Sequence, residues 1–249
     1  MNKLSFFLVS LLIAAGPVAS AQTVQVAAAA NLQSVLTTKI IPAFEAKTHI
    51  TVVPVFGATK TLEQQFENGA PYEVFISADT TTVDKLADEH LVDKASVKPY
   101  AIGTLVIWYL NSAPSHPASI AALTDPKVQH IAVANPKTAP YGTAAMEAIA
   151  SSNLTAALTP KIVFAENIQQ ALQYGVTGNA DVSFTALSLV IDRKDGAWTV
   201  VPESLHKPIE QSEGVAANAS PAAKKFADFL TSKDADKIWS TSGYHVPKK

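Results

Sequence analysis

The chain has 249 residues, a formal net charge of −2 and no cysteine. A near-neutral charge provides no basic field, so the composition is not that of a protein that binds nucleic acid or adheres to an anionic membrane. The lack of cysteine excludes disulfides, thiolate chemistry, cysteine-ligated metals and a lipid attached to cysteine.

The first 21 residues have the pattern of a secretory signal. Lys3 supplies a positive charge, residues 6–15 form an apolar run, and Ala19-Ser20-Ala21 is a small-x-small cleavage site. The alternative, a membrane anchor, is disfavoured because the run is shorter than the roughly 20 residues that a spanning helix needs. We therefore expect cleavage after Ala21 and a soluble mature protein, residues 22–249, in the periplasm.

The mature chain predicts strands and helices in alternation. The periodicity of apolar residues predicts strands at residues 24–28, 50–56, 74–77, 105–110, 131–134, 161–164 and 182–184, and helices at residues 31–44, 59–68, 142–151 and 167–174. Pro42 is expected to kink the first helix or to start a second turn, and Gly69 to end the second helix. Alternating βα units favour an α/β fold with mainly parallel sheets covered by helices.

Two weak boundary signals lie at residues 99–103 and 208–214. After the second, Phe226, Phe229 and Leu230 form one helical face, and Ile238 and Trp239 form another. Because these faces are apolar, we expect the C-terminal segment to pack back onto an existing domain.

Enzyme signatures are absent from the sequence. It contains no G-x-S-x-G, H-E-x-x-H, P-loop or G-x-G-x-x-G motif, and its six histidines are scattered without an i,i+4 pair. No cluster of carboxylates is visible for acid–base or calcium chemistry. The sequence therefore predicts no catalytic residue, no cofactor and no metal held directly by side chains.

Four predicted helix starts carry small, hydroxyl or amide residues: Ala30-Asn31, Ala58-Thr59, Pro140-Tyr141-Gly142 and Asn167-Ile168. The first turn of a helix offers unpaired N–H groups and about half a positive charge, which makes it an anion site. The competing interpretation is ordinary capping, because Asn and Thr are common N-cap residues.

Three stretches resemble the periplasmic molybdate-binding protein family of ABC import systems. They are QVAAAANL at residues 25–32, FGATKTL at residues 56–62 and, most specifically, GAPYEVFISAD at residues 69–79. The segments VANP at residues 133–136 and PYG at residues 140–142 stand where that family has its third ligand loop. Residues 226–244 resemble the closing helices of many solute-binding proteins, so the resemblance covers essentially the whole mature chain.

The resemblance implies a two-lobed periplasmic binding protein-like fold of type II, in which two crossing strands form the hinge and the ion lies in the cleft. Lobe 1 would comprise residues 22–102 and 208–249, and lobe 2 residues 103–207. The implied function is capture of a tetrahedral oxyanion, molybdate with tungstate as a second ion, for an ABC permease in the inner membrane. We expect a monomer without enzymatic activity or nucleic-acid partner.

The resemblance also implies ligand residues. Asn31 and Thr59 stand where the family contacts the ion through side chain and backbone, next to Ala30. Tyr141 and Ile168 stand at positions that donate a backbone N–H. The family often has a further tyrosine ligand where this chain has Thr185, and Tyr141 could take its place from the opposite side of the cleft.

Lys60 departs from the family, which usually has a small hydroxyl residue there. A lysine in the first helical turn opposes the helix dipole unless a bound anion lies nearby. If Lys60 faces the cleft, it is a counter-charge for another anion, such as sulfate, a phosphonate or a small phosphorylated or carboxylated ligand. If it points to solvent, molybdate remains favoured. An exported hydrolase is a third alternative, disfavoured by the missing nucleophile–base motif.

Overall fold

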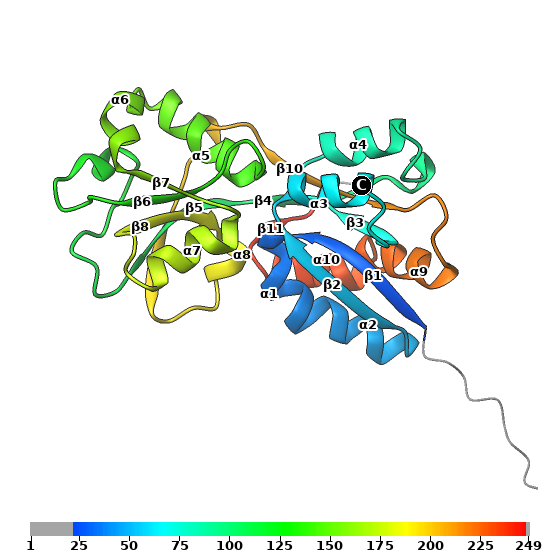
Figure 1. The fold of residues 1–249 in the computed structure, drawn as a ribbon. Helices are drawn as coiled ribbons and strands as arrows, with labels where there is room; N and C mark the ends of the chain where they lie inside the picture. Colours follow the sequence, from blue (N-terminus) through cyan, green and yellow to red (C-terminus); the bar gives the residue numbers. More distant parts are fainter. Residues whose placement is uncertain (1–21, 248–249) are drawn as a thin grey trace, which may run out of the picture.

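The computed structural model describes residues 22–247 as two α/β lobes that lie side by side (Figure 1). The proposed signal segment, including the cleavage site after Ala21, lies outside the described residues. Between residues 22 and 247, no helix has the length and apolar character needed to cross a bilayer. The expected two-lobed α/β architecture is confirmed.

The first lobe is built on a six-stranded sheet in the order β11-β4-β10-β3-β1-β2. Its strands are β1 (Thr23–Ala29), β2 (Thr51–Gly57), β3 (Val74–Ile76), β4 (Lys98–Gly103), β10 (Ile209–Val215) and β11 (Tyr244–His245). Its helices are α1 (Gln33–Val35), α2 (Ile41–Thr48), α3 (Thr59–Glu67), α4 (Thr81–Asp88), α9 (Pro221–Leu230) and α10 (Lys233–Ser240).

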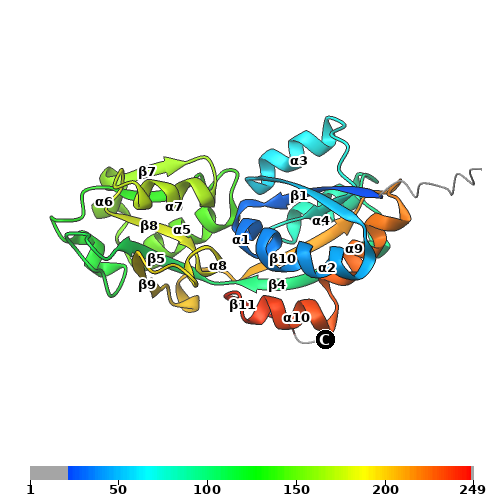
Figure 2. The same ribbon diagram turned by 90° about the horizontal axis from the view of Figure 1, so that it is seen from below.

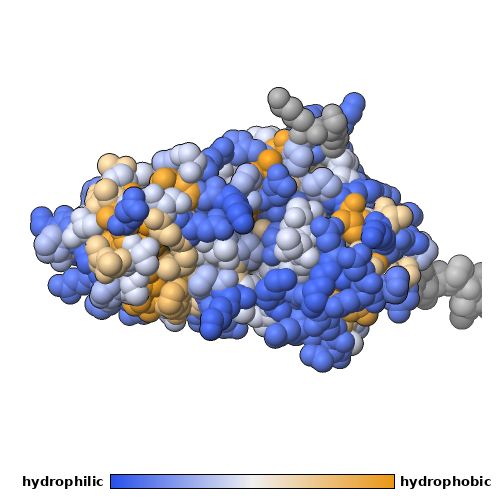
Figure 3. All heavy atoms as spheres, turned by 90° about the horizontal axis from the view of Figure 1, so that it is seen from above, coloured by the Kyte–Doolittle hydropathy of each residue, from blue (hydrophilic) through white to orange (hydrophobic). Residues whose placement is uncertain are grey.

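The second lobe is built on a five-stranded sheet in the order β7-β6-β8-β5-β9. Its strands are β5 (Leu105–Leu110), β6 (Ile131–Ala134), β7 (Ile162–Ala165), β8 (Val182–Ala186) and β9 (Gly196–Val200). Its helices are α5 (Pro140–Ser151), α6 (Thr155–Leu158), α7 (Ile168–Val176) and α8 (Leu187–Val190). Apolar side chains gather over this lobe on the face seen in Figure 3, whereas the surface between the lobes is mostly polar there.

Both sheets are mixed, so the expectation of mainly parallel sheets is wrong in detail. The βα strands pair in parallel, β1 with β2 and β3, and β6 with β7 and β8. The strands around the two lobe crossings, β4 to β5 and β9 to β10, pair antiparallel with their neighbours. The reason is topological: a strand that carries the chain across to the other lobe, or back, does not continue the βα winding. The proposed lobe boundaries fall at the end of β4 and just before β10, and they stay a prediction.

The first helical segment runs without interruption from Ala30 to Thr48. It begins as a 3₁₀ turn, η1 (Ala30–Leu32), and widens to a π-helical turn, η2 (Leu36–Ile40), directly before α2. Pro42 lies in the first turn of α2, where its missing N–H is tolerated because the wider turn has already changed the hydrogen-bond register. The second turn that was expected at Pro42 is therefore observed as a change from a π-helical turn to an α-helix.

The C-terminal helices pack on the first lobe, as their apolar faces predict (Figure 2). Phe226 of α9 lies edge-on to Phe44 of α2, with ring centroids 5.0 Å apart. The fully buried Trp239 of α10 lies 5.1 Å from the Tyr100 ring of β4. The Trp239 ring also lies 5.4 Å from the ring of Tyr244 in β11, the strand that pairs with β4 beside the lobe boundary.

Candidate functional site

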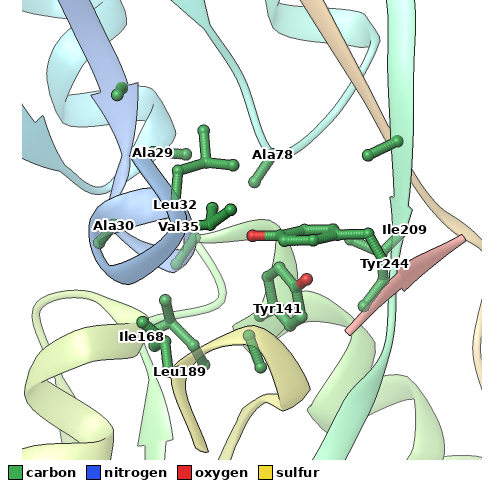
Figure 4. Close-up of a cluster of buried hydrophobic side chains, with 14 of the residues drawn as sticks. Ala29, Ala30, Leu32, Val35, Ala78, Tyr141, Ile168, Leu189, Ile209 and Tyr244 are labelled. Atoms are coloured by element: carbon green, nitrogen blue, oxygen red, sulfur yellow. The ribbon is translucent and has the colours of Figure 1, made fainter. Parts of the chain in front are cut away.

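A small cavity that is partly open to solvent lies between the lobes. Residues from both lobes line it: Ala29, Ala30, Asn31, Gly57, Ala58, Thr59, Ala78, Ala139, Pro140, Tyr141, Asn167 and Ile168. All of these side chains are neutral, and most are small. Figure 4 shows Ala78, Tyr141 and Ile168 on separate elements around the helical turn that carries Ala30.

Three helical segments begin at this cavity without a side-chain cap. The N-cap residues are Ala29 before η1, Ala58 before α3 and Ala139 before α5, and none makes a side-chain capping bond. Alanine at an N-cap typically costs about 1 kcal/mol relative to Ser or Asn, because first-turn N–H groups keep no partner in the helix. Helices α9 and α10, away from the cavity, are capped by Ser220 and Ser232. Helices α4, α6 and α8 also lack a side-chain cap without lining the cavity. The distinguishing feature is that three uncapped starts converge on one cavity, where a single ligand can supply the missing acceptors.

The capping interpretation of the helix starts is wrong for Asn31 and Thr59, which lie inside their helical segments rather than at the N-cap. It is correct for Asn167, whose Oδ1 accepts a 3.0 Å hydrogen bond from the backbone N–H of Gln170. This cap leaves the N–H of Ile168, the first residue of α7, at the cavity end of the helix.

Thr59 is buried, and its hydroxyl oxygen accepts a 3.3 Å hydrogen bond from the backbone N–H of Ala78. A hydroxyl that accepts in this way keeps its own proton for another acceptor. Both Thr59 and Ala78 line the cavity. The Thr59 side chain is thus set to donate to a bound oxygen atom, alongside the backbone N–H groups of its helix.

Tyr141 lines the cavity from the first turn of α5, where it follows Pro140, the first residue of the helix. The helix start lies tightly on the end of β6: a Cβ atom added at Gly142 would be 2.1 Å from the carbonyl oxygen of Ala134. Burial raises the pKa of the Tyr141 phenol well above its usual value, so the hydroxyl stays protonated and neutral. The close packing of the α5 start on the end of β6 therefore determines the position of the Tyr141 backbone N–H.

Asn31 is fully buried and is held by both lobes. Its Nδ2 donates to Oε1 of Gln211 at 2.9 Å and to the Tyr244 hydroxyl at 3.0 Å. Its carbonyl oxygen accepts 3.0 Å hydrogen bonds from the hydroxyls of Ser188 and Tyr244. In Figure 4 the Tyr244 hydroxyl is directed toward this helical start. Gln211 and Tyr244 could not be recognised from sequence patterns, because their roles depend on contacts between distant segments.

The structure brings five of the six candidate residues around the cavity: Ala30, Asn31, Thr59, Tyr141 and Ile168. Lys60 is not among the lining residues, and its ammonium group forms a 2.8 Å ion pair with Glu63 one turn further along α3. Thr185 is fully buried but does not line the cavity either.

The cavity has the chemistry of an anion site and lacks that of a cation site. Its donors are backbone N–H groups and neutral side chains, and no acidic side chain lines it. No group of three or more metal-ligating side chains occurs anywhere in residues 22–247. Two lobes, crossing strands and helix starts that converge on one small cavity define a solute-binding protein.

Comparisons with known proteins agree with this class. Residues 24–245 match the model of the bacterial extracellular solute-binding protein family. The molybdate-binding protein ModA of Azotobacter vinelandii is 38% identical over 254 residues, covering 97% of this chain and 99% of the relative. ModA of Rhodobacter capsulatus is 37% identical over 203 residues, covering 81% and 80%. The chain belongs to the periplasmic molybdate-binding proteins of the solute-binding family.

Solved structures give the same result. The periplasmic molybdate-binding protein of Azotobacter vinelandii superposes with a TM-score of 0.85 at 30% identity, covering 90% of this chain and all of that one. The sulfate-binding protein SubI of Mycobacterium tuberculosis has a TM-score of 0.75 at 18% identity, covering 90% and 87%, and this likeness shows the fold alone. The curated relatives named ModA are binding proteins rather than enzymes.

Proposed function

We propose that this chain is a periplasmic receptor that captures molybdate, and tungstate as a second ion, for an ABC importer. The observation that carries the proposal is the convergence of uncapped helix starts from both lobes on one neutral cavity. The names and coverage of the relatives support molybdate as the ion.

Neutral donors suit a dehydrated dianion. The site must replace the water that the ion loses, and hydrogen bonds to a charged group contribute about 1.5–3 kcal/mol each. Backbone N–H groups of Asn31, Thr59, Tyr141 and Ile168, with the Thr59 hydroxyl, supply roughly five donors. Such a set supports dissociation constants in the micromolar to nanomolar range, about −8 to −12 kcal/mol.

A site made only of donors also selects against protonated ions. An oxyanion that carries an O–H would direct its proton at an N–H group, which leaves two donors facing each other. Phosphate is largely monoprotonated at neutral pH and is disfavoured for this reason. Sulfate and molybdate are both unprotonated there, so they are distinguished by the size of the cavity.

The proposal includes delivery to a permease in the inner membrane, export through a signal cleaved after Ala21, and a monomer without catalysis. Delivery is inferred from the family, and export from the composition of residues 1–21. The alternative with Lys60 as counter-charge has less support, because the ammonium group pairs with Glu63 and does not line the cavity.

Calorimetric titration of the mature protein with molybdate, tungstate, sulfate and phosphate tests the proposal. We expect submicromolar to micromolar binding of molybdate and tungstate, weaker sulfate binding and no detectable phosphate binding. A heat of binding with sulfate or phosphate but not with molybdate or tungstate would show that the protein binds another anion. No heat of binding with any of the four ions would contradict the proposal.

A further inference from the structure

A buried hydrogen-bond network joins the cavity to the crossing strands. Gln211, fully buried on β10, accepts at Oε1 from Nδ2 of Asn31 and from the Tyr100 hydroxyl, each at 2.9 Å. Its Nε2 donates to the Tyr141 hydroxyl of the second lobe at 3.3 Å. One side chain therefore contacts two residues at the cavity, Asn31 and Tyr141, that belong to different lobes.

The donors and acceptors of this network do not balance as oriented. Oδ1 of Asn31 is buried and has no hydrogen-bond partner within residues 22–247. The single proton of the Tyr100 hydroxyl faces two acceptors, Oε1 of Gln211 and the carbonyl oxygen of Ser77. The Tyr141 hydroxyl accepts from Gln211 and, although the Asn31 side chain lies beside it, forms no hydrogen bond as a donor in the described part of the chain.

Turning both amides by 180° removes the mismatches at Tyr100 and Tyr141, since the O and NH₂ ends of an amide have nearly the same shape. In exchange, the Tyr244 hydroxyl then has one proton facing two acceptors, the carbonyl oxygen and Oδ1 of Asn31. Nε2 of Gln211 then donates to Oδ1 of Asn31 and to the Tyr100 hydroxyl. The Tyr100 proton goes to Ser77 alone, and the Tyr141 proton goes to Oε1 of Gln211. Nδ2 of Asn31 is released on the side of the amide that had no partner.

We propose that Gln211 is a positioning residue that makes Asn31 an anion donor in the liganded protein. In that state Gln211 holds Oδ1 of Asn31, so that the Asn31 NH₂ group is presented to the cavity. Without an anion, Asn31 donates instead to Gln211 and Tyr244, as in the orientation described above. This inference rests on the proposed function, because it needs an anionic ligand.

The backbone leaves room for this contact between lobes. Gly103 ends β4 at the first lobe crossing, and a Cβ atom there would be 2.0 Å from the Tyr141 hydroxyl oxygen and 2.6 Å from Nε2 of Gln211. The Tyr141–Gln211 pair therefore forms only because the crossing strand has no side chain at this point. Because Tyr141 belongs to the second lobe, the network is complete only when the lobes are closed.

A double-mutant cycle between Gln211→Met and Asn31→Ala tests the proposal, with the molybdate dissociation constant as the readout. Methionine keeps the length of glutamine but has no hydrogen-bonding amide. With Asn31 present, Gln211→Met should weaken molybdate binding about 10- to 100-fold, the value of one hydrogen bond to a charged ligand. In the Asn31→Ala background the same change should weaken binding less than about threefold, because the group that Gln211 positions is gone.

Gln65→Met is the control for the chemical change, since Gln65 is an exposed residue of α3 that accepts a hydrogen bond from the Tyr72 hydroxyl and does not line the cavity. It should leave molybdate affinity unchanged. If Gln211→Met does not fold, Tyr141→Phe replaces it in the cycle, because it removes the hydroxyl that donates to Gln211 in the liganded orientation. Its loss of affinity should likewise disappear in the Asn31→Ala background.

Equal losses in both backgrounds, or no loss in either, would overturn the positioning role and leave the proposed function intact. Failure of the unmutated protein to bind molybdate, tungstate, sulfate or phosphate would overturn both. The two failures are distinguishable because the unmutated protein is titrated first.

Discussion

The backbone N–H of Lys60 donates a 3.0 Å hydrogen bond to the carbonyl oxygen of Thr138. Lys60 belongs to α3 of the first lobe, and Thr138 precedes α5 of the second, so this bond closes the cleft directly beside the cavity. The hydrogen bond from Ser188 to the Asn31 carbonyl oxygen crosses between the same lobes. The structure therefore has the closed geometry in which helix starts from both lobes reach one ligand.

Removal of the Thr59 hydroxyl should weaken oxyanion binding. Thr59→Val keeps the side-chain shape but loses the donor that faces the cavity, and it also leaves the Ala78 N–H without its acceptor. We expect the molybdate dissociation constant to rise about 10- to 100-fold, measured by calorimetry.

Thr82→Val is the matched control for this change. Thr82 is also fully buried, but its hydroxyl has no hydrogen-bond partner within the described chain and lies outside the cavity lining. Its replacement should leave affinity unchanged and the thermal midpoint equal or higher, because an unsatisfied polar group is removed. Equal affinity losses in the two variants would show that the Thr59 effect is not specific.

Replacement of Lys60 should have little effect on affinity. Lys60 pairs with Glu63, whose carboxylate also binds Lys85 at 2.8 Å and so retains a partner in Lys60→Ser. Burial is the largest single influence on the pKa of Glu63 and raises it, but the hydrogen bonds and charges of the two lysines together outweigh burial, so the pKa lies below its usual value. We expect the dissociation constants of molybdate and sulfate to change less than about threefold, because an exposed charge on the protein surface contributes little energy. A loss of tenfold or more in titrations with either ion would favour the counter-charge alternative.

The buried carboxyl group of Glu213 should give the free energy of unfolding an unusual dependence on pH. It is fully buried on β10, and neither carboxylate oxygen has a hydrogen-bond partner in residues 22–247. Desolvation raises its pKa well above 4.5, although Lys98 lowers it; Asp228, which is ion-paired with Lys98 at 2.9 Å, raises it further. The folded protein therefore retains a proton that the unfolded chain has already lost.

Whether stability rises or falls with pH follows from the number of protons that the folded and unfolded states bind. Because the native pKa is the higher one, the stability contribution is complete below the unfolded pKa and declines as pH rises above it, by at most about 1.4 kcal/mol per pH unit. Glu213→Gln should remove this decline. Denaturant titrations from pH 5 to pH 8 should show a stability gain for Glu213→Gln that grows with pH. A gain that is constant or shrinks with pH would contradict the buried, protonated state.

Much of the fold could be predicted from apolar periodicity. The strands at residues 105–110 and 131–134 were predicted with the bounds that the structure has, because continuous apolar runs there are buried on both faces. Strand β10 was recognised only as a boundary signal. Its polar residues, including Gln211 and Glu213, conceal a buried strand, because their burial depends on packing between segments that are far apart in the sequence.

The candidate site was predictable at its helix starts and not beyond them. The residues around Ala30, Thr59, Tyr141 and Ile168 could be placed because strand-to-helix turns meet at one edge of a sheet. The direction of the Lys60 side chain could not, because ordinary sequence patterns do not distinguish a pair with Glu63 from a free cation. The amide network around Gln211 was also beyond reach, since it joins residues that are 70 to 180 positions apart.

Anomalous scattering from a molybdate complex tests the central claim most directly. Crystals of the mature protein grown with molybdate would be measured at the molybdenum absorption edge. The account predicts one molybdenum peak in the cavity, with oxygens about 2.7–2.9 Å from the backbone nitrogens of Thr59, Tyr141 and Ile168. A peak beside the Lys60 ammonium group, or an empty cavity at saturating molybdate, would contradict it.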